Sequence, residues 1–223
     1  SPWTGPIVVA LCAALGPWLV TDAPWTWGVC AVLFVAVGLP HGAVDHITYH
    51  HALGQSAKTA PWRFVGPYMA GLVAFAGWLL WMPAPATWAF LALSSWHFGQ
   101  SHLSGPSNTW VGRFRGCALG AVLIGTLLNA QHASSVEVML HWMSGVEATH
   151  MLDLVAAMLP WALGLWAGAW IWELVRGMSD RSKRDKAIEW LHEGAWLAAM
   201  WLLATQSDLL WAFTAYFCLG HAV

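Results

Sequence analysis

Six of the eleven histidines in this chain lie within or close to strongly apolar segments. An ionisable side chain at membrane depth is costly, usually faces a bundle interior or a cavity, and there marks function. Neutral imidazole is the commonest metal ligand, and a cation would supply the partner that buried histidines otherwise lack. The sequence therefore predicts a metal site. Its candidate ligands are His41, His46, His97, His102, His192 and His221.

Two carboxylates accompany these histidines. Asp45 follows His41 by four residues, so in a helix it shares the same face and could accept the second ring N–H of a metal-binding histidine. Asp45 could equally be a helix-end carboxylate at the membrane interface. Glu193 follows His192 and could either act as an anion beside the metal ligands or pair with a base of the inner loop. Imidazoles with nearby carboxylates suit Fe, Zn, Cu or Ni.

Composition indicates an integral membrane protein. Of 223 residues, 58% are hydrophobic and only 9% are charged, whereas soluble domains usually carry about 25% charged residues. Nineteen tryptophans fit a bilayer protein, because tryptophan concentrates where hydrocarbon meets headgroups. The net charge of −2 comes without a basic stripe, so we expect no nucleic-acid partner. We predict a multi-pass protein of the cell membrane that contacts membrane lipid.

Apolar segments that approach the roughly 20 residues of a spanning helix recur along the whole chain. We therefore predict an all-α transmembrane helical bundle of about 7–8 spans, forming a single integral membrane domain over residues 1–223. The sequence starts at Ser1 and stops inside an apolar stretch at Val223, so we expect a fragment with both ends incomplete. The expected spans are 5–20, 25–46, 63–82, 86–103, 113–131, 151–175, 187–205 and 208–223.

The basic residues predict the orientation of these spans. All nine fall after the second, fourth and sixth expected spans. The loops on the opposite side carry acidic residues but no lysine or arginine. By the positive-inside rule the basic side is cytoplasmic, which places the six histidines, and so the metal site, toward the cytoplasmic half of the bilayer. The basic residues are Lys58, Arg63, Arg113, Arg115, Arg176, Arg181, Lys183, Arg184 and Lys186.

Three segments together resemble one known family. They read GLPHGAVDH at residues 38–46, WHFG at 96–99 and YFCLGH at 216–221. In this order they are similar to motifs of the Brp/Blh family of bacterial and archaeal β-carotene 15,15′-dioxygenases, and the resemblance runs from about residue 30 to the end of the chain. The first and last motifs are quite specific, whereas the middle one would be weak alone.

The resemblance implies a non-haem Fe2+ bound by His41, His97 and His221, which would be the catalytic residues. It also implies O2-dependent cleavage of β-carotene, or a related carotenoid, at the central 15,15′ double bond to give retinal, with a functional link to a retinal-binding rhodopsin. A further family histidine would follow His221 by one helical turn, beyond Val223.

The remaining candidates would surround the iron rather than form its required ligand set. The family usually has an aspartate where this chain has His102, a change that could add a ligand or alter the charge beside the metal. The Pro-Pro pair that commonly precedes the last motif is replaced by Gln206-Ser207-Asp208. Both departures leave the identity of the carotenoid open. The surrounding candidates are Asp45, His46, His102, His192 and Glu193.

Two other functions remain open on sequence alone. His46, His50 and His51 have the spacing of a histidine box, which would fit a membrane di-iron desaturase or hydroxylase. Buried histidines could also serve a transporter or proton-relay protein, which would need neither iron nor O2. For a carotenoid, we expect an apolar tunnel lined by aromatic residues. The candidates are Trp96, Phe98, Phe213, Tyr216 and Phe217.

Overall fold

The computed structural model describes residues 3–18, 24–38, 62–103, 109–176 and 183–221. Every regular element within these residues is helical, which confirms the expected all-α class. The elements are α1 (Thr4–Leu15), η1 (Gly16–Trp18), α2 (Pro24–Leu33), η2 (Phe34–Gly38), α4 (Trp62–Trp81), α5 (Pro83–His102), α6 (Trp110–Ala130), α7 (His132–Met139), α8 (Gly145–Arg176), α9 (Lys183–Gln206), α10 (Leu209–Thr214) and η3 (Ala215–His221). Of these, η1 is a 3₁₀ helix, and η2 and η3 are π-helical.

Local sequence signals explain several helix ends. Pro83 begins α5 after the single residue Met82 that separates it from α4, at a position where the missing N–H of proline would have no helical partner anyway. The Thr109 hydroxyl caps α6 by accepting from the backbone N–H of Gly112. The Asp208 carboxylate caps α10 by accepting from the backbone N–H of Trp211 at 2.9 Å. Each cap satisfies a donor that the first helical turn leaves unpaired.

The helices follow most of the expected spans, with two differences. Helix α8 begins at Gly145 and not at residue 151, and the short helix α7 lies where only a loop was expected. Within the part of the chain that the structure describes, two helices are long and apolar enough to cross a membrane, namely α6 and residues Gly145–Val175 of α8. The total of 7–8 spans therefore stays a prediction, and shorter apolar helices account for several of the remaining expected spans.

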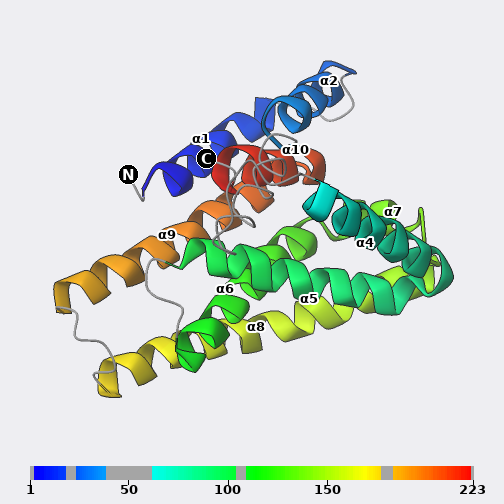
Figure 1. Cartoon of the computed structure of the whole chain (residues 1–223). Coiled ribbons are helices and arrows are strands. Elements are labelled where there is room, and N and C mark those ends of the chain that lie inside the picture. Colours follow the sequence, from blue (N-terminus) through cyan, green and yellow to red (C-terminus); the bar gives the residue numbers. More distant parts are fainter. Residues whose placement is uncertain (1–2, 19–23, 39–61, 104–108, 177–182, 222–223) are drawn as a thin grey trace.

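Helix α6 is the centre of the arrangement. It packs against α5 on one side and α8 on another, and it also contacts α9 (Figure 1). Helix α1, from the start of the chain, lies along α9 and against η3, from its end. The Trp211 indole N–H donates to the carbonyl of Cys12 at 3.2 Å and so ties α10 to α1. The two ends of the sequence thus share one core.

The backbones of α5 and α6 approach so closely that only glycine fits at their crossing. A Cβ added to Gly99 would lie 1.7 Å from the carbonyl oxygen of Gly116, and one added to Gly120 would lie 1.9 Å from that of Ser95. Small residues allow this kind of contact between helices in membrane proteins. Gly99 belongs to the WHFG segment. The close contact at Gly99 therefore also fixes the position of the helical turn that carries His97.

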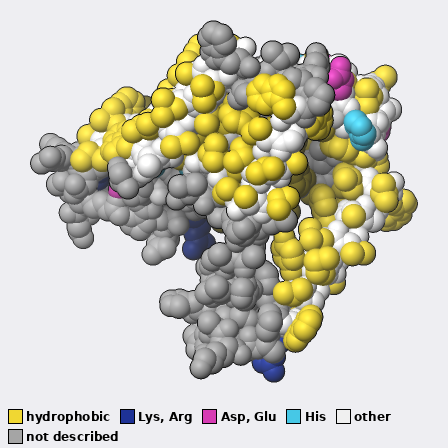
Figure 2. All heavy atoms as spheres, turned by 90° about the horizontal axis from the view of Figure 1, so that it is seen from above, with side chains coloured by type: hydrophobic (Ala, Val, Ile, Leu, Met, Phe, Trp, Pro, Cys, Tyr) yellow, Lys and Arg dark blue, Asp and Glu magenta, His cyan; other side chains and the backbone are white. Residues whose placement is uncertain are grey.

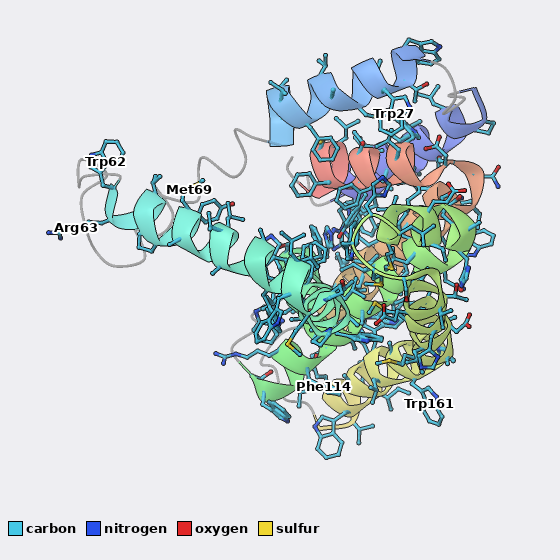
Figure 3. All side chains as sticks on the ribbon, turned by 90° about the vertical axis from the view of Figure 1, so that its right-hand side faces the viewer. Trp27, Trp62, Arg63, Met69, Phe114 and Trp161 are labelled. Atoms are coloured by element: carbon cyan, nitrogen blue, oxygen red, sulfur yellow. The ribbon has the colours of Figure 1, made fainter. Side chains whose placement is uncertain are left out.

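The outer surface is strongly apolar, while several charged side chains are buried. Figure 2 shows hydrophobic side chains over much of the face that it presents. Figure 3 shows Trp62 and Trp161 pointing away from the other helices, and each is 76% exposed. Arg115 and Glu193, by contrast, are 3% and 0% exposed. A large exposed apolar surface is the usual sign of a membrane or partner contact.

Replacing Gly99 by alanine tests the helix crossing. We expect Gly99→Ala to lower the free energy of unfolding by about 1–3 kcal/mol, because the added methyl group would overlap backbone atoms of α6. Gly77→Ala on α4 is the matched control: a Cβ there has no neighbour within 4 Å, so alanine should raise helix stability by about 0.5–1 kcal/mol. Denaturant unfolding in detergent micelles measures both; equal effects would contradict the close crossing.

Candidate functional site

Two π-helical segments are associated with the first and last motifs. Segment η2 ends at Gly38, three residues before His41, and η3 contains the last motif and ends at His221. π-Helical turns are rare and are frequently found at functional sites. The ring of Phe34 in η2 stacks on Phe213 and Phe217, with centroid distances of 6.0 and 5.8 Å. The segment that leads to His41 therefore lies beside the segment that carries His221.

Helix α5, which carries the middle motif, also packs against η3. The ring centroid of Phe98 lies 5.3 Å from that of Tyr216 and 6.4 Å from that of Phe217. His97 precedes Phe98, contacts its ring at 5.4 Å and is itself exposed. The elements that bear two of the three motif histidines, His97 and His221, are thus in direct contact.

The structure does not describe three of the residues predicted at the iron site, and it does not describe the side chain of a fourth. His41, Asp45 and His46 fall in residues 39–61, and the side chain of His221 also lies outside the described part. Among the side chains that the structure does describe, no three of His, Cys, Asp or Glu are placed to hold a metal ion. The ligand set His41, His97 and His221 therefore stays a prediction. The packing fits it, because η2 and α5 both contact η3.

His102 and His192 line a buried aromatic cluster. The Nε2 atom of His102 lies 2.8 Å from the Tyr216 hydroxyl, and its ring centroid lies 3.9 Å from that of Trp196. His192 contacts Trp196 and Trp3 edge-on, at 6.4 and 5.6 Å. Trp196 therefore lies against both histidines and connects α5, α9 and η3.

Glu193 belongs to a separate, charged cluster. Its Oε2 atom accepts hydrogen bonds from the indole N–H groups of Trp166 and Trp170 at 2.8 and 2.9 Å. Its Oε1 atom lies 3.3 Å from Nη2 of Arg115, whose Nη1 donates to Glu173 at 2.5 Å. The Arg115 guanidinium also lies 4.1 Å from the centroid of the Trp170 ring, a cation–π geometry. Glu193 is therefore paired with a base, one of its two expected roles.

The sequence grouped Arg115 with the basic residues between the fourth and fifth expected spans, at the start of the span expected over residues 113–131, and gave no sign that it is buried. Arg115 is in the second turn of α6 and is 3% exposed. A charge in such a position needs a charged and hydrogen-bonded partner, and Glu173 and Glu193 supply it from α8 and α9. Arg115 still lies near the start of α6, so it stays within the group of basic residues that predicts the orientation.

A sequence comparison gives the identity at the level of a family. The family model for beta-carotene 15,15′-dioxygenase matches residues 32–223. The chain belongs to this family. Comparisons with curated proteins and with solved structures gave no match. The matched range contains all three motif segments, which confirms the resemblance drawn from them.

Sequence reasoning missed several residues that shape the site in this β-carotene 15,15′-dioxygenase family member. Glu173 and Arg115 carry opposite charges at the inner ends of expected spans, a signal that could have suggested a pair. Tyr216 was singled out only as an aromatic residue, and its partner, His102, is 114 residues away. No sequence signal indicated Trp166, Trp170 or Trp196.

The charged cluster predicts that one substitution, Glu193→Gln, changes the stability of the protein in opposite directions with and without Arg115. Arg115→Met should lower the stability of the family member by about 3–5 kcal/mol, because it leaves the buried Glu193 carboxylate and the half-buried Glu173 carboxylate without their base. Glu193→Gln should destabilise the protein that retains Arg115, since it breaks a buried pair. The same change should stabilise the Arg115→Met variant, since it removes an uncompensated charge.

Thermal unfolding in detergent measures these four proteins. Asp153→Asn is the control, because Asp153 pairs with His132 at 3.4 Å on the exposed surface, where ion pairs contribute little. If Glu193→Gln had the same sign in both backgrounds, the coupling between Glu193 and Arg115 would be refuted.

Proposed function

We propose that this chain is an iron-dependent membrane dioxygenase that cleaves β-carotene, or a related carotenoid, at the central 15,15′ double bond. The observation that carries the proposal is the family match over residues 32–223. In the proposed reaction one carbon–carbon double bond breaks and two carbonyl groups form, and both oxygen atoms come from O2. Cleavage of the symmetric β-carotene would give two molecules of retinal, which a retinal-binding rhodopsin could use.

His41, His97 and His221 would hold the iron. When bound, Fe2+ would supply the O2-activating chemistry that cleavage of a polyene requires. Imidazole ligands are neutral, so they would leave the positive charge of the ion uncompensated and preserve its Lewis acidity. The packing of α5 against η3 through Phe98 and Tyr216 supports this assignment, because it brings two of the three motifs together.

A carotenoid would reach such a site from the bilayer. β-Carotene is apolar and dissolves in lipid, and the exposed apolar surface suits a chain surrounded by lipid. Close to His97, Leu93 and Trp96 are 65% and 46% exposed on α5. Phe213 and Phe217 stack with an interplanar angle of only 4° and would offer flat apolar surfaces to a polyene. We propose lateral entry beside α5, with the metal site toward the cytoplasmic side.

The family match favours the dioxygenase over the two alternatives. A di-iron desaturase or hydroxylase would rely on the box formed by His46, His50 and His51, which lies outside the described residues. A transporter or proton-relay protein would not require a carotenoid or O2.

Expression in a β-carotene-producing bacterium tests the proposal. The cells should lose their orange colour and accumulate retinal, and His97→Ala should reduce retinal to the level of cells without the enzyme. His150→Ala is the matched control, because His150 is exposed on α8, a helix that carries none of the three motifs. Retinal is measured by chromatography and membrane insertion by fractionation. Orange cells that contain correctly inserted protein would contradict the proposed function.

A further inference from the structure

The hydrogen bond between His102 and Tyr216 joins two elements that are far apart in the sequence. His102 is the last residue of α5, and Tyr216 is the second residue of η3. Their side chains are 4% and 2% exposed, so water cannot readily replace the bond. A buried hydroxyl or imidazole that loses its partner retains the full cost of leaving water. The pair therefore holds α5 and η3 together specifically rather than through apolar contact alone.

The surroundings fix the orientation of the His102 ring. Trp196 packs on the ring with a centroid distance of 3.9 Å, while the Tyr216 hydroxyl meets its Nε2 edge. Tyr216 is in turn held by Phe98 at 5.3 Å and by Trp196 at 6.2 Å. Because Nε2 of His102 is engaged by the hydroxyl, this nitrogen is not directed at a metal ion.

His102 and Tyr216 each lie close in sequence to a motif histidine: His102 is near His97, and Tyr216 is near His221. Phe98 and His102 are one helical turn apart on α5, and both contact Tyr216. His97 directly precedes Phe98, so the position of this turn also sets the position of His97. In η3, Tyr216 precedes His221 by five residues, which is the hydrogen-bonding period of a π-helix. A change in the His102–Tyr216 contact would therefore shift His97 relative to the backbone of His221.

We propose that His102 and Tyr216 are positioning residues: their hydrogen bond sets the separation of the α5 and η3 turns that carry His97 and His221. The inference rests on the proposed function, because it takes these two histidines to be metal ligands. His102 then acts on the metal site through Tyr216 and not as a ligand through Nε2.

Four variants of the purified protein separate the hydrogen bond from packing. Tyr216→Phe removes only the hydroxyl, and His102→Phe keeps a ring against Trp196 but removes Nε2. The double variant tests whether the two residues act as a unit. His102→Gln is the conservative rescue, because its amide nitrogen can donate to the Tyr216 hydroxyl from a position close to that of Nε2. Tyr68→Phe on the exposed face of α4 is the matched control.

The main readout is the affinity for Fe2+ and for Co2+, whose visible absorption reports the ligand geometry without turnover. Loss of a residue that orients metal ligands typically costs about 10–100-fold in affinity. We expect Tyr216→Phe and His102→Phe each to weaken binding by about this factor and to change the Co2+ spectrum. The double variant should be no weaker than the worse single variant, and His102→Gln and Tyr68→Phe should remain close to the parent protein.

Thermal unfolding of the same proteins identifies a purely structural role. Lower stability with an unchanged metal affinity and Co2+ spectrum would overturn the positioning role, and so would additive effects in the double variant. If the parent protein makes retinal and binds Fe2+ while Tyr216→Phe binds it equally well, only this inference fails. If the parent protein binds neither Fe2+ nor Co2+, the proposed function fails and the inference fails with it.

Discussion

A polar side chain inside an apolar helical bundle has little access to water, so it must be paired by another group of the protein. Two buried clusters satisfy this requirement here. Arg115 is paired with Glu173 and Glu193 across α6, α8 and α9, and His102 is paired with Tyr216 across α5 and η3. Because removing one partner is more costly than losing an apolar contact, these pairings define which helices are neighbours.

The two clusters meet neighbouring positions of α9, because Glu193 and Trp196 are three residues apart on that helix. Glu193 joins the charged cluster with α6 and α8, and Trp196 contacts His102, His192 and Tyr216 in the aromatic cluster. Helix α9 thus connects the charged cluster to the aromatic cluster beside the motifs. The close crossing at Gly99 adds a third constraint, because it fixes α5 against α6 within the same WHFG segment that contains His97. The candidate site is therefore positioned by packing on several sides.

Sequence reasoning predicted the helices well where an apolar run was long. Helices α4, α5, α6 and α9 lie close to the expected spans, because the length of an apolar run limits where a helix can lie. It failed for α7, whose eight residues are too few to give a clear pattern. It also missed the burial of Arg115, because counting basic residues takes no account of a carboxylate 58 residues away. The prediction for Glu193 allowed pairing with a base, and only the tertiary structure identified that base as buried.

For the site, residue type and motif order were sufficient to select the candidate ligands and the family. They were not sufficient to find the partners. His102 is hydrogen-bonded to Tyr216, and both residues contact Trp196. These contacts form between helices that are far apart in the sequence but pack together in space. Such contacts follow from packing, which a motif does not encode.

We propose that imidazoles of His41, His97 and His221 bind iron in this member of the β-carotene 15,15′-dioxygenase family. X-ray absorption at the iron K-edge of the purified protein tests it most directly, because imidazole rings produce a characteristic pattern of scattering from their outer atoms. We predict an iron spectrum dominated by imidazole scattering, with that contribution reduced in His97→Ala. Sulfur ligands, or an imidazole contribution that is unchanged in His97→Ala, would contradict the assignment.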